Sequence, residues 1–135
     1  YFLSLMAEDK NKQSITKVFA LLKIVDKDKR YDPEAYSFIM ASLDYTIKKL
    51  KRKGHVSGKE LSDGIKDYCL EQFGPMARLV LEKWGIKSTN DFGEIVFNLI
   101  DSGLLGRTEE DRKEDFHNRY DFKEAFDKGC KYSLH

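Results

Sequence analysis

The sequence has almost no net charge and very little cysteine, and each absence removes a class of protein. Its 24 lysines and arginines are balanced by 23 aspartates and glutamates, which leaves a net charge of +1 at pH 7. A dedicated duplex-binding protein usually carries a basic surplus, because neutralising phosphates supplies much of its affinity. The two cysteines, Cys69 and Cys130, are isolated and form neither a disulfide framework nor a zinc-binding pattern. The sequence therefore predicts a cytoplasmic protein in which nucleic-acid binding is disfavoured.

Long apolar runs and the common catalytic motifs are also missing. The apolar opening YFLSL is far too short for a membrane span, so no membrane partner is expected. The chain has no G-x-S-x-G, no H-E-x-x-H, no phosphate-binding loop and no glycine-rich dinucleotide motif. We therefore predict that the protein is not an enzyme and has no catalytic residue, cofactor or metal. A small enzyme with a pocket between its longest helix and its second half is a third hypothesis.

What is present is the composition of one ordinary globular domain. The 135 residues are 41% hydrophobic and 35% charged, with nine phenylalanines and seven tyrosines, which is enough to build a single core without disulfides. No repeat or low-complexity linker divides the chain. We expect a flexible N-terminus over 1–13, one mostly helical domain over 14–127 and a flexible C-terminus over 128–135.

Two helices are expected in the first part of this domain. The first begins at Ser14, a good N-cap, and should end near Asp26. Its apolar stripe has helical spacing and comprises Ile15, Val18, Phe19 and Leu22. The second begins at Asp32-Pro33, where proline at the first helical position costs no hydrogen bond, and Gly54 is its expected C-cap. Its stripe comprises Tyr36, Ile39 or Met40, Leu43, Ile47 and Leu50.

The second half, 57–122, has the outline of a winged helix-turn-helix. Its three short helices are delimited by capping boxes at Ser57/Glu60 and Ser88/Asp91 and by the tight turn Gly74-Pro75. An extended stretch from Leu104 should double back as a β-hairpin that includes Tyr120. The expected fold class is mainly α with a small β-hairpin, in which two N-terminal helices pack on the winged-helix-like half.

Two residues of this half carry specific packing predictions. Gly64 lies inside a helix, which it weakens by about 1 kcal/mol relative to alanine, so another backbone should pass close to it. Trp84, the single tryptophan, ends the middle helix and should be a core residue that holds the three short helices together. Three further residues of its helix are expected to be buried, namely Met76, Leu79 and Val80.

The helix that would enter the DNA groove, Thr89–Ser102, has the wrong surface for that task. In winged helices the helix after the second turn contacts the major groove. Here it contains no lysine or arginine, and its carboxylates would be repelled by phosphates. We instead expect its polar positions to form a face for a protein partner, which comprises Asn90, Asp91, Glu94, Asn98 and Asp101.

A basic cluster at the end of the longest helix supports an alternative. Its members are Lys48, Lys49, Lys51, Arg52 and Lys53. Such a cluster could bind a polyanion, and nucleic-acid binding through it is the alternative hypothesis. The structural explanation is that cations in the last turns of a helix complement its dipole and stay solvated.

Several strings in the chain resemble a small family of uncharacterised bacterial proteins of about 130–150 residues. The strings are RYDPEAYSF, GHVSGKEL, QFGPMA, WGI and DFGEIVFNLI, and the resemblance covers about residues 18–126. It implies a bacterial source and a stand-alone domain, and it implies no activity, cofactor or ligand. The leading hypothesis from the sequence is therefore a non-catalytic protein-interaction module with winged-helix-like architecture.

Overall fold

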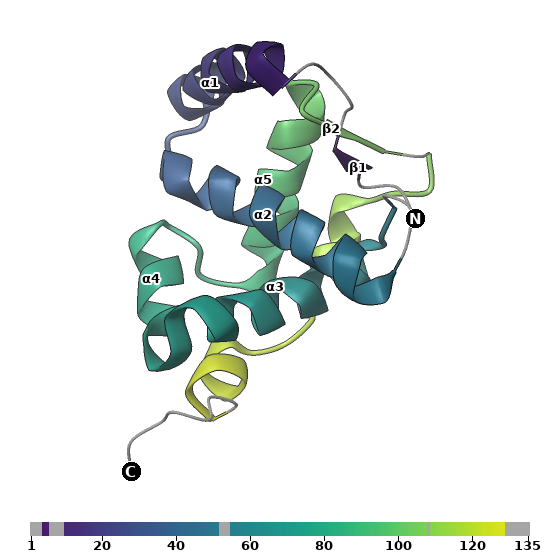
Figure 1. The fold of residues 1–135 in the computed structure, drawn as a ribbon. Helices are drawn as coiled ribbons and strands as arrows, with labels where there is room; N and C mark the ends of the chain where they lie inside the picture. Colours follow the sequence, from purple (N-terminus) through teal and green to yellow (C-terminus); the bar gives the residue numbers. More distant parts are fainter. Residues whose placement is uncertain (1–3, 6–9, 52–54, 108, 129–135) are drawn as a thin grey trace.

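The computed structural model describes residues 4–5, 10–51, 55–107 and 109–128 and is mostly helical. The described residues contain five α-helices, which pack around one core, and a short pair of strands. Figure 1 shows the strand pair at the side of the helices. The elements are β1 (Ser4–Leu5), α1 (Lys10–Lys27), α2 (Pro33–Leu50), α3 (Gly58–Phe73), α4 (Ala77–Lys83), α5 (Thr89–Asp101) and β2 (Leu105–Gly106). Three short turns of helix complete the fold, namely η1 (Gly74–Met76), η2 (Lys113–Phe116) and η3 (Lys123–Lys128).

Helix α2 runs through the centre of the molecule and begins where the sequence indicates. The Asp32 carboxylate caps it by accepting a hydrogen bond from the Glu34 N–H at 2.9 Å, and Pro33 is the first helical residue. Its buried side chains include Tyr36, Ile39, Met40 and Leu43. Leu50, expected at the end of the same stripe, is 40% exposed. The helix ends at Leu50, and its C-cap is Lys51, which adopts a left-handed conformation with φ of 55°. The expected C-cap was Gly54, which lies outside the described residues.

Helix α3 packs closely on α2 at the glycine that the sequence singles out. Its start is fixed by the predicted capping box, in which the Glu60 N–H donates to Ser57 Oγ and the Ser57 N–H donates to Glu60 Oε1. A Cβ atom placed on Gly64 would lie 1.8 Å from Thr46 Oγ1 of α2. The predicted close approach at Gly64 is therefore confirmed, although the neighbour is a side chain rather than another backbone.

Helix α4 is short, and the loop after it fixes the turn between α1 and α2. Gly85 has φ of 92°, and a Cβ atom there would lie 2.1 Å from the carbonyl oxygen of Arg30. The Asp32 N–H also donates to the Trp84 carbonyl at 3.1 Å. Trp84 is half-buried rather than fully buried, and its ring packs on Phe38 of α2 and Phe73 of α3 at centroid distances of 5.3 and 5.8 Å.

The predicted burial along the α4 segment is only partly correct. Met76 and Leu79 are 51% and 57% exposed, and Val80 is partly buried. Ala77 and Leu81 lie four residues apart on one face of α4 and are the residues buried against the core, so the core-facing side differs from the one that the sequence indicates.

The predicted β-hairpin is wrong. Strand β2 pairs antiparallel with β1 from the N-terminus, with Leu5 opposite Leu105, and not with residues around Tyr120. The charged segment after β2 instead forms η2, whose Phe116 is fully buried. Gly58 of α3 and Gly93 of α5 leave room for η2, since a Cβ atom on either would lie 2.8–3.0 Å from its residues. The burial of one phenylalanine between two glycine-bearing helices thus replaces the expected wing.

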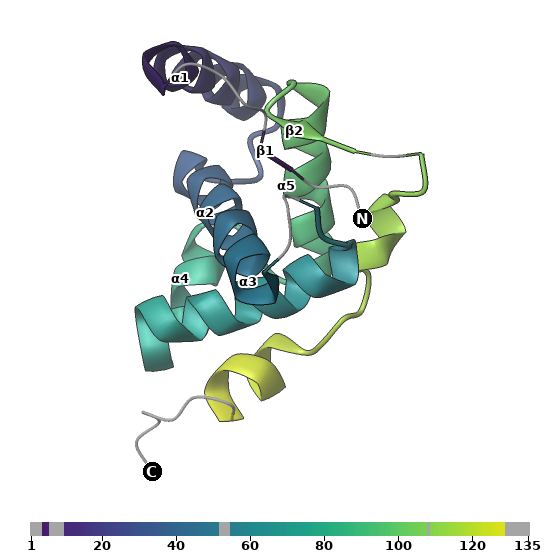
Figure 2. The same ribbon diagram turned by 45° about the vertical axis from the view of Figure 1, so that its right-hand side comes forward.

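The ends of the described chain differ from the sequence expectation in detail. Ser4–Leu5 form a strand and α1 begins at Lys10 rather than Ser14, so part of the segment 1–13 has regular structure. Near the C-terminus, η3 is a π-helical turn with Phe126 buried. Figure 2 shows α1 at one end of the molecule and η3 near the other. Among the described residues, no helix is both long enough and apolar enough to cross a membrane.

Candidate partner-binding groove

Helix α1 is attached to the rest of the protein along one narrow face. Ile24 is buried in the core, and Leu21 and Val25 pack partly against it. Three other apolar positions among residues 18–27 of this helix point into solvent. Val18, Phe19 and Leu22, which we name the apolar row, are 56%, 63% and 60% exposed. The apolar stripe expected from the sequence is therefore exposed at these three positions, and the side chain of its fourth member, Ile15, lies outside the described part of the chain.

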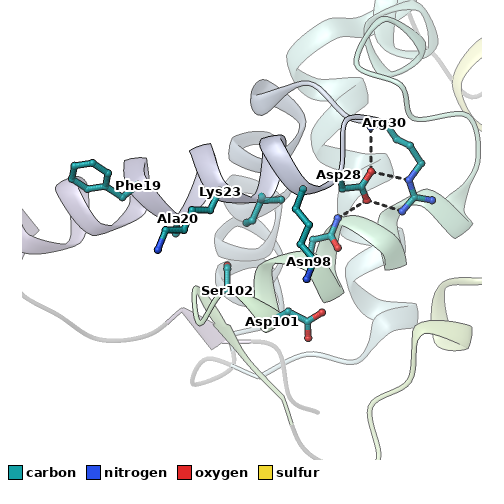
Figure 3. Close-up of a pocket in the computed structure, with 10 residues that line it drawn as sticks. Phe19, Ala20, Lys23, Asp28, Arg30, Asn98, Asp101 and Ser102 are labelled. Atoms are coloured by element: carbon teal, nitrogen blue, oxygen red, sulfur yellow. Dashed lines mark hydrogen bonds and ion pairs between the residues drawn. The ribbon is translucent and has the colours of Figure 1, made fainter.

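A groove of about 790 Å³ lies between α1 and the C-terminal end of α5. Phe19 of the apolar row forms part of its wall, and Ala20 and Ile24 supply further apolar surface. Figure 3 shows α1 along one side of the groove and Asp101 and Ser102 on the opposite side. The two sides carry charges of opposite sign, because Lys23 and Lys27 belong to the α1 side and Asp101 belongs to α5.

A set of hydrogen bonds between Asp28, Arg30, Asn98 and Tyr36, which we name the polar junction, closes one end of the groove. The Arg30 guanidinium donates to both oxygens of Asp28, at 2.9 and 2.7 Å. The Asn98 amide of α5 donates to Asp28 Oδ2 at 2.9 Å and to the Tyr36 hydroxyl at 3.0 Å. Figure 3 shows the bonds from Arg30 and Asn98 converging on Asp28. The junction therefore ties the end of α1 to both α2 and α5.

The electrostatics of this junction stabilise the ionised form of Asp28. Hydrogen bonds from Arg30 are the main cause that holds the pKa of the Asp28 carboxyl well below its usual range, and the bond from Asn98 acts in the same direction. Burial, followed by a 2.5 Å hydrogen bond to Asp91, raises the pKa of the neighbouring Tyr31 hydroxyl well above its usual range. Asp28 is thus a fixed anion and Tyr31 a fixed donor at neutral pH.

Most of the predicted partner-binding face of α5 is engaged within the protein. Asp91 accepts hydrogen bonds from Tyr31 and from the backbone N–H groups before the helix. Glu94 pairs with Lys113 at 2.8 Å and with Arg30 at 3.5 Å. Asn90 accepts a hydrogen bond from the Asn118 N–H at 3.0 Å.

The two remaining members of that face reach the groove. Asn98 belongs to the polar junction, and Asp101 is exposed at the rim. Of the predicted face, only the C-terminal end therefore lies beside the groove.

The basic cluster at the end of α2 lies far along the chain from this groove and has acidic neighbours. Lys48 pairs with Asp44 at 2.9 Å, and Lys49 pairs with Asp67 of α3 at 2.5 Å. Lys51 is exposed at the C-cap. The other two members, Arg52 and Lys53, lie outside the described residues. Because Lys48 and Lys49 each pair with an aspartate, their attraction for a polyanion is partly offset.

No protein-family model, no curated protein and no solved structure matches the chain.

The residues that line the groove from α1 were given no functional role by the sequence interpretation. Periodic apolar spacing identifies a face of a helix, but it does not say whether that face is covered. A usable signal was nevertheless present, because α1 contains five lysines and a single aspartate. A strongly basic amphipathic helix is typical of segments that bind a surface or a partner.

Proposed function

We propose that the protein is a non-catalytic interaction module that binds a partner protein along the apolar row of α1 and in the groove beside it. The observation that carries this proposal is the exposure of Val18, Phe19 and Leu22 on a helix that borders a groove. Single exposed apolar residues are common on protein surfaces, whereas contiguous ones beside a concavity are typical of binding sites.

Covering this surface would make a substantial favourable contribution to binding. Complete burial of a valine, leucine or phenylalanine side chain is worth about 1.5–3 kcal/mol. The three residues of the apolar row retain more than half of their exposure, so covering them would contribute roughly 3–5 kcal/mol in total. That amount corresponds to about 10²–10⁴-fold in affinity, before any contribution from the charged rim.

Two further features favour a protein partner over a nucleic acid. The lysines Lys48 and Lys49 are paired with aspartates, which weakens the case for nucleic acid. The packing of α3, α4 and α5 supports a winged-helix-like half without a β-hairpin, and Asp91 and Glu94 of α5 would repel a phosphate-lined groove. A cytoplasmic location is part of the proposal, since the thiol of Cys69 is free and buried.

Site-specific photo-crosslinking tests the proposal. A photoreactive amino acid is placed at Leu22 in the apolar row or, as a matched control, at Ser37, which is exposed on α2. We expect the same polypeptide to be crosslinked in the native host from Leu22 and not from Ser37. The partner, once identified by mass spectrometry and purified, should bind the wild-type chain at least tenfold more tightly than Val18→Ser/Leu22→Ser.

The double variant also separates binding from folding. Both side chains are mostly exposed, and surface substitutions usually change stability by no more than about 0.5 kcal/mol. Val18→Ser/Leu22→Ser should therefore unfold at the wild-type temperature to within a few degrees. Equal crosslinking from Leu22 and Ser37, or unchanged affinity in the double variant, would overturn the proposal.

A further inference from the structure

We propose that the occupant of this surface is an acidic amphipathic helix of the partner protein, an inference that rests on the proposed function. Its apolar side would cover the apolar row of Val18, Phe19 and Leu22. Its carboxylates would lie against Lys23 and Lys27 on the α1 side of the groove. Laying the apolar face of a helix into a groove is a common mode of peptide recognition.

The charge of the partner follows from the uneven distribution of charge in the chain. Helix α1 holds five lysines against one aspartate, while the whole chain has a net charge of only +1. The cations are therefore concentrated in the helix that also exposes the apolar row. Lys23 and Lys27 are exposed and line the groove, so a partner that covers Phe19 has both ammonium groups beside it. Opposite charges across an interface favour the correct partner and disfavour others.

The form of the partner follows from the shape and polarity of the groove. An anionic membrane is the usual alternative for a basic amphipathic helix. A bilayer surface is flat and uniformly negative, whereas this surface is hollowed by about 790 Å³ and has Asp101 on its far side. A polypeptide can fill the hollow and present a positive or neutral group to Asp101. The same two-signed rim disfavours a nucleic acid.

The charge of α1 also disfavours a second copy of this chain as the occupant. Two α1 helices packed along their apolar rows would bring one lysine-rich helix against another. Like charges at an interface oppose association. The apolar row alone would permit self-association. The lysines of α1 therefore favour an acidic partner helix over a second copy of this chain.

The test uses two synthetic helical peptides with the same leucine seam and opposite flanking charge. One carries glutamate at the positions that flank the seam, and the other carries lysine at those positions. Binding of each labelled peptide to the full chain is measured by fluorescence anisotropy at low and at physiological salt. Three variants are compared with the wild-type chain: Phe19→Ser, Lys23→Glu/Lys27→Glu and the charge-matched control Lys83→Glu/Lys87→Glu. The control lysines are exposed near α4 and are not part of the groove.

We expect the wild-type chain to bind the acidic peptide about tenfold more tightly than the basic one, with the preference falling as salt rises. Lys23→Glu/Lys27→Glu should reverse the preference, whereas the control variant should bind as the wild type does. Phe19→Ser should weaken binding of both peptides by about tenfold. This combination of results would support the acidic helix.

The other outcomes separate this inference from the proposed function. Equal binding of the two peptides, weakened by Phe19→Ser, overturns the acidic partner and leaves the apolar docking surface in place. Binding of neither peptide, together with Phe19-dependent binding to phosphatidylglycerol vesicles, overturns the inference in favour of a membrane. A dimer in sedimentation analysis that Phe19→Ser dissociates overturns it in favour of a second copy. If Phe19→Ser changes none of these measurements, both the inference and the proposed function are wrong.

Discussion

Replacing Gly64 by alanine adds one methyl group where α3 and α2 meet most closely. A Cβ atom at this position would lie 1.8 Å from Thr46 Oγ1 and 2.9 Å from Thr46 Cβ. Real Cβ atoms essentially never have contacts of this length, so either the threonine rotates or the two helices separate. Rotation would break the hydrogen bond that the Thr46 hydroxyl donates to the Ser42 carbonyl at 2.7 Å in the buried interface.

The expected size of the effect comes from two opposing contributions. Alanine is favoured over glycine inside a helix by about 1 kcal/mol. Overpacking a core usually costs about 1–3 kcal/mol, and a broken buried hydrogen bond adds about 1–3 kcal/mol. The steric cost at Gly64 therefore exceeds the helical preference, and Gly64→Ala should lower the free energy of unfolding by about 2 kcal/mol. For a domain of this size, that loss lowers Tm on the order of 8 °C.

Urea and thermal unfolding followed by circular dichroism measure the loss. Thr46→Ala removes the hydroxyl that meets the new methyl group. In a Thr46→Ala background, Gly64→Ala should therefore lower the free energy of unfolding by no more than half as much as in the wild type. Asp63→Ala, at an exposed neighbouring position of α3, is the control and should change stability by no more than about 0.5 kcal/mol. A Gly64→Ala variant that melts above the wild type would show that the helices are not in close contact here.

Three further predictions concern individual side chains. Trp84→Ala should lower stability by about 2–3 kcal/mol in urea unfolding, below the usual cost for a fully buried tryptophan, because the ring is half-buried against Phe38 and Phe73; a loss under about 0.5 kcal/mol would contradict this. Burial raises the pKa of the Cys69 thiol to about 12, so Cys69 should react with a disulfide reagent at pH 8 only after denaturant is added. The lowered pKa of Asp28 means that its contribution to stability is present above its unfolded pKa and is lost as pH falls toward the folded value. Asp28→Asn should therefore lose less stability than the wild type between pH 5 and pH 2, and parallel acid-unfolding curves would refute the role of this carboxyl.

The starts of α2 and α3 were predictable because capping depends on a few neighbouring residues. Asp32 before Pro33 and Ser57 with Glu60 satisfy the N–H groups that a helix start leaves unpaired. These bonds form within four residues of chain, so the local sequence contains all the information that they require. The buried face of α5 was predictable for a similar reason, since its apolar residues recur with helical spacing.

The β-hairpin could not be predicted correctly because strand pairing is a long-range choice. Leu105 pairs with Leu5, about 100 residues away in the chain, and nothing in the segment around Leu105 specifies that partner. The competing element, η2, is held by the buried ring of Phe116. Its site depends on the small size of Gly58 and Gly93, which come from two different helices. Glycines inside helices were a signal of close approach, and only the one at Gly64 was interpreted in that way.

The groove was missed for two reasons. The net charge of +1 argues against a polyanion partner for the chain as a whole. The chain nevertheless contains one strongly basic helix, whose charge is offset by acidic residues elsewhere. The apolar spacing of α1 indicates an apolar face but not whether other elements pack on it. Among residues 18–27, the side of the helix that bears Ile24 packs against the core. The exposed side retains Val18, Phe19 and Leu22, whose continued exposure to water is unfavourable. Helix α1 thus combines five lysines and a single aspartate with an exposed apolar row. One acidic amphipathic helix would both cover the apolar row and pair with lysines of α1.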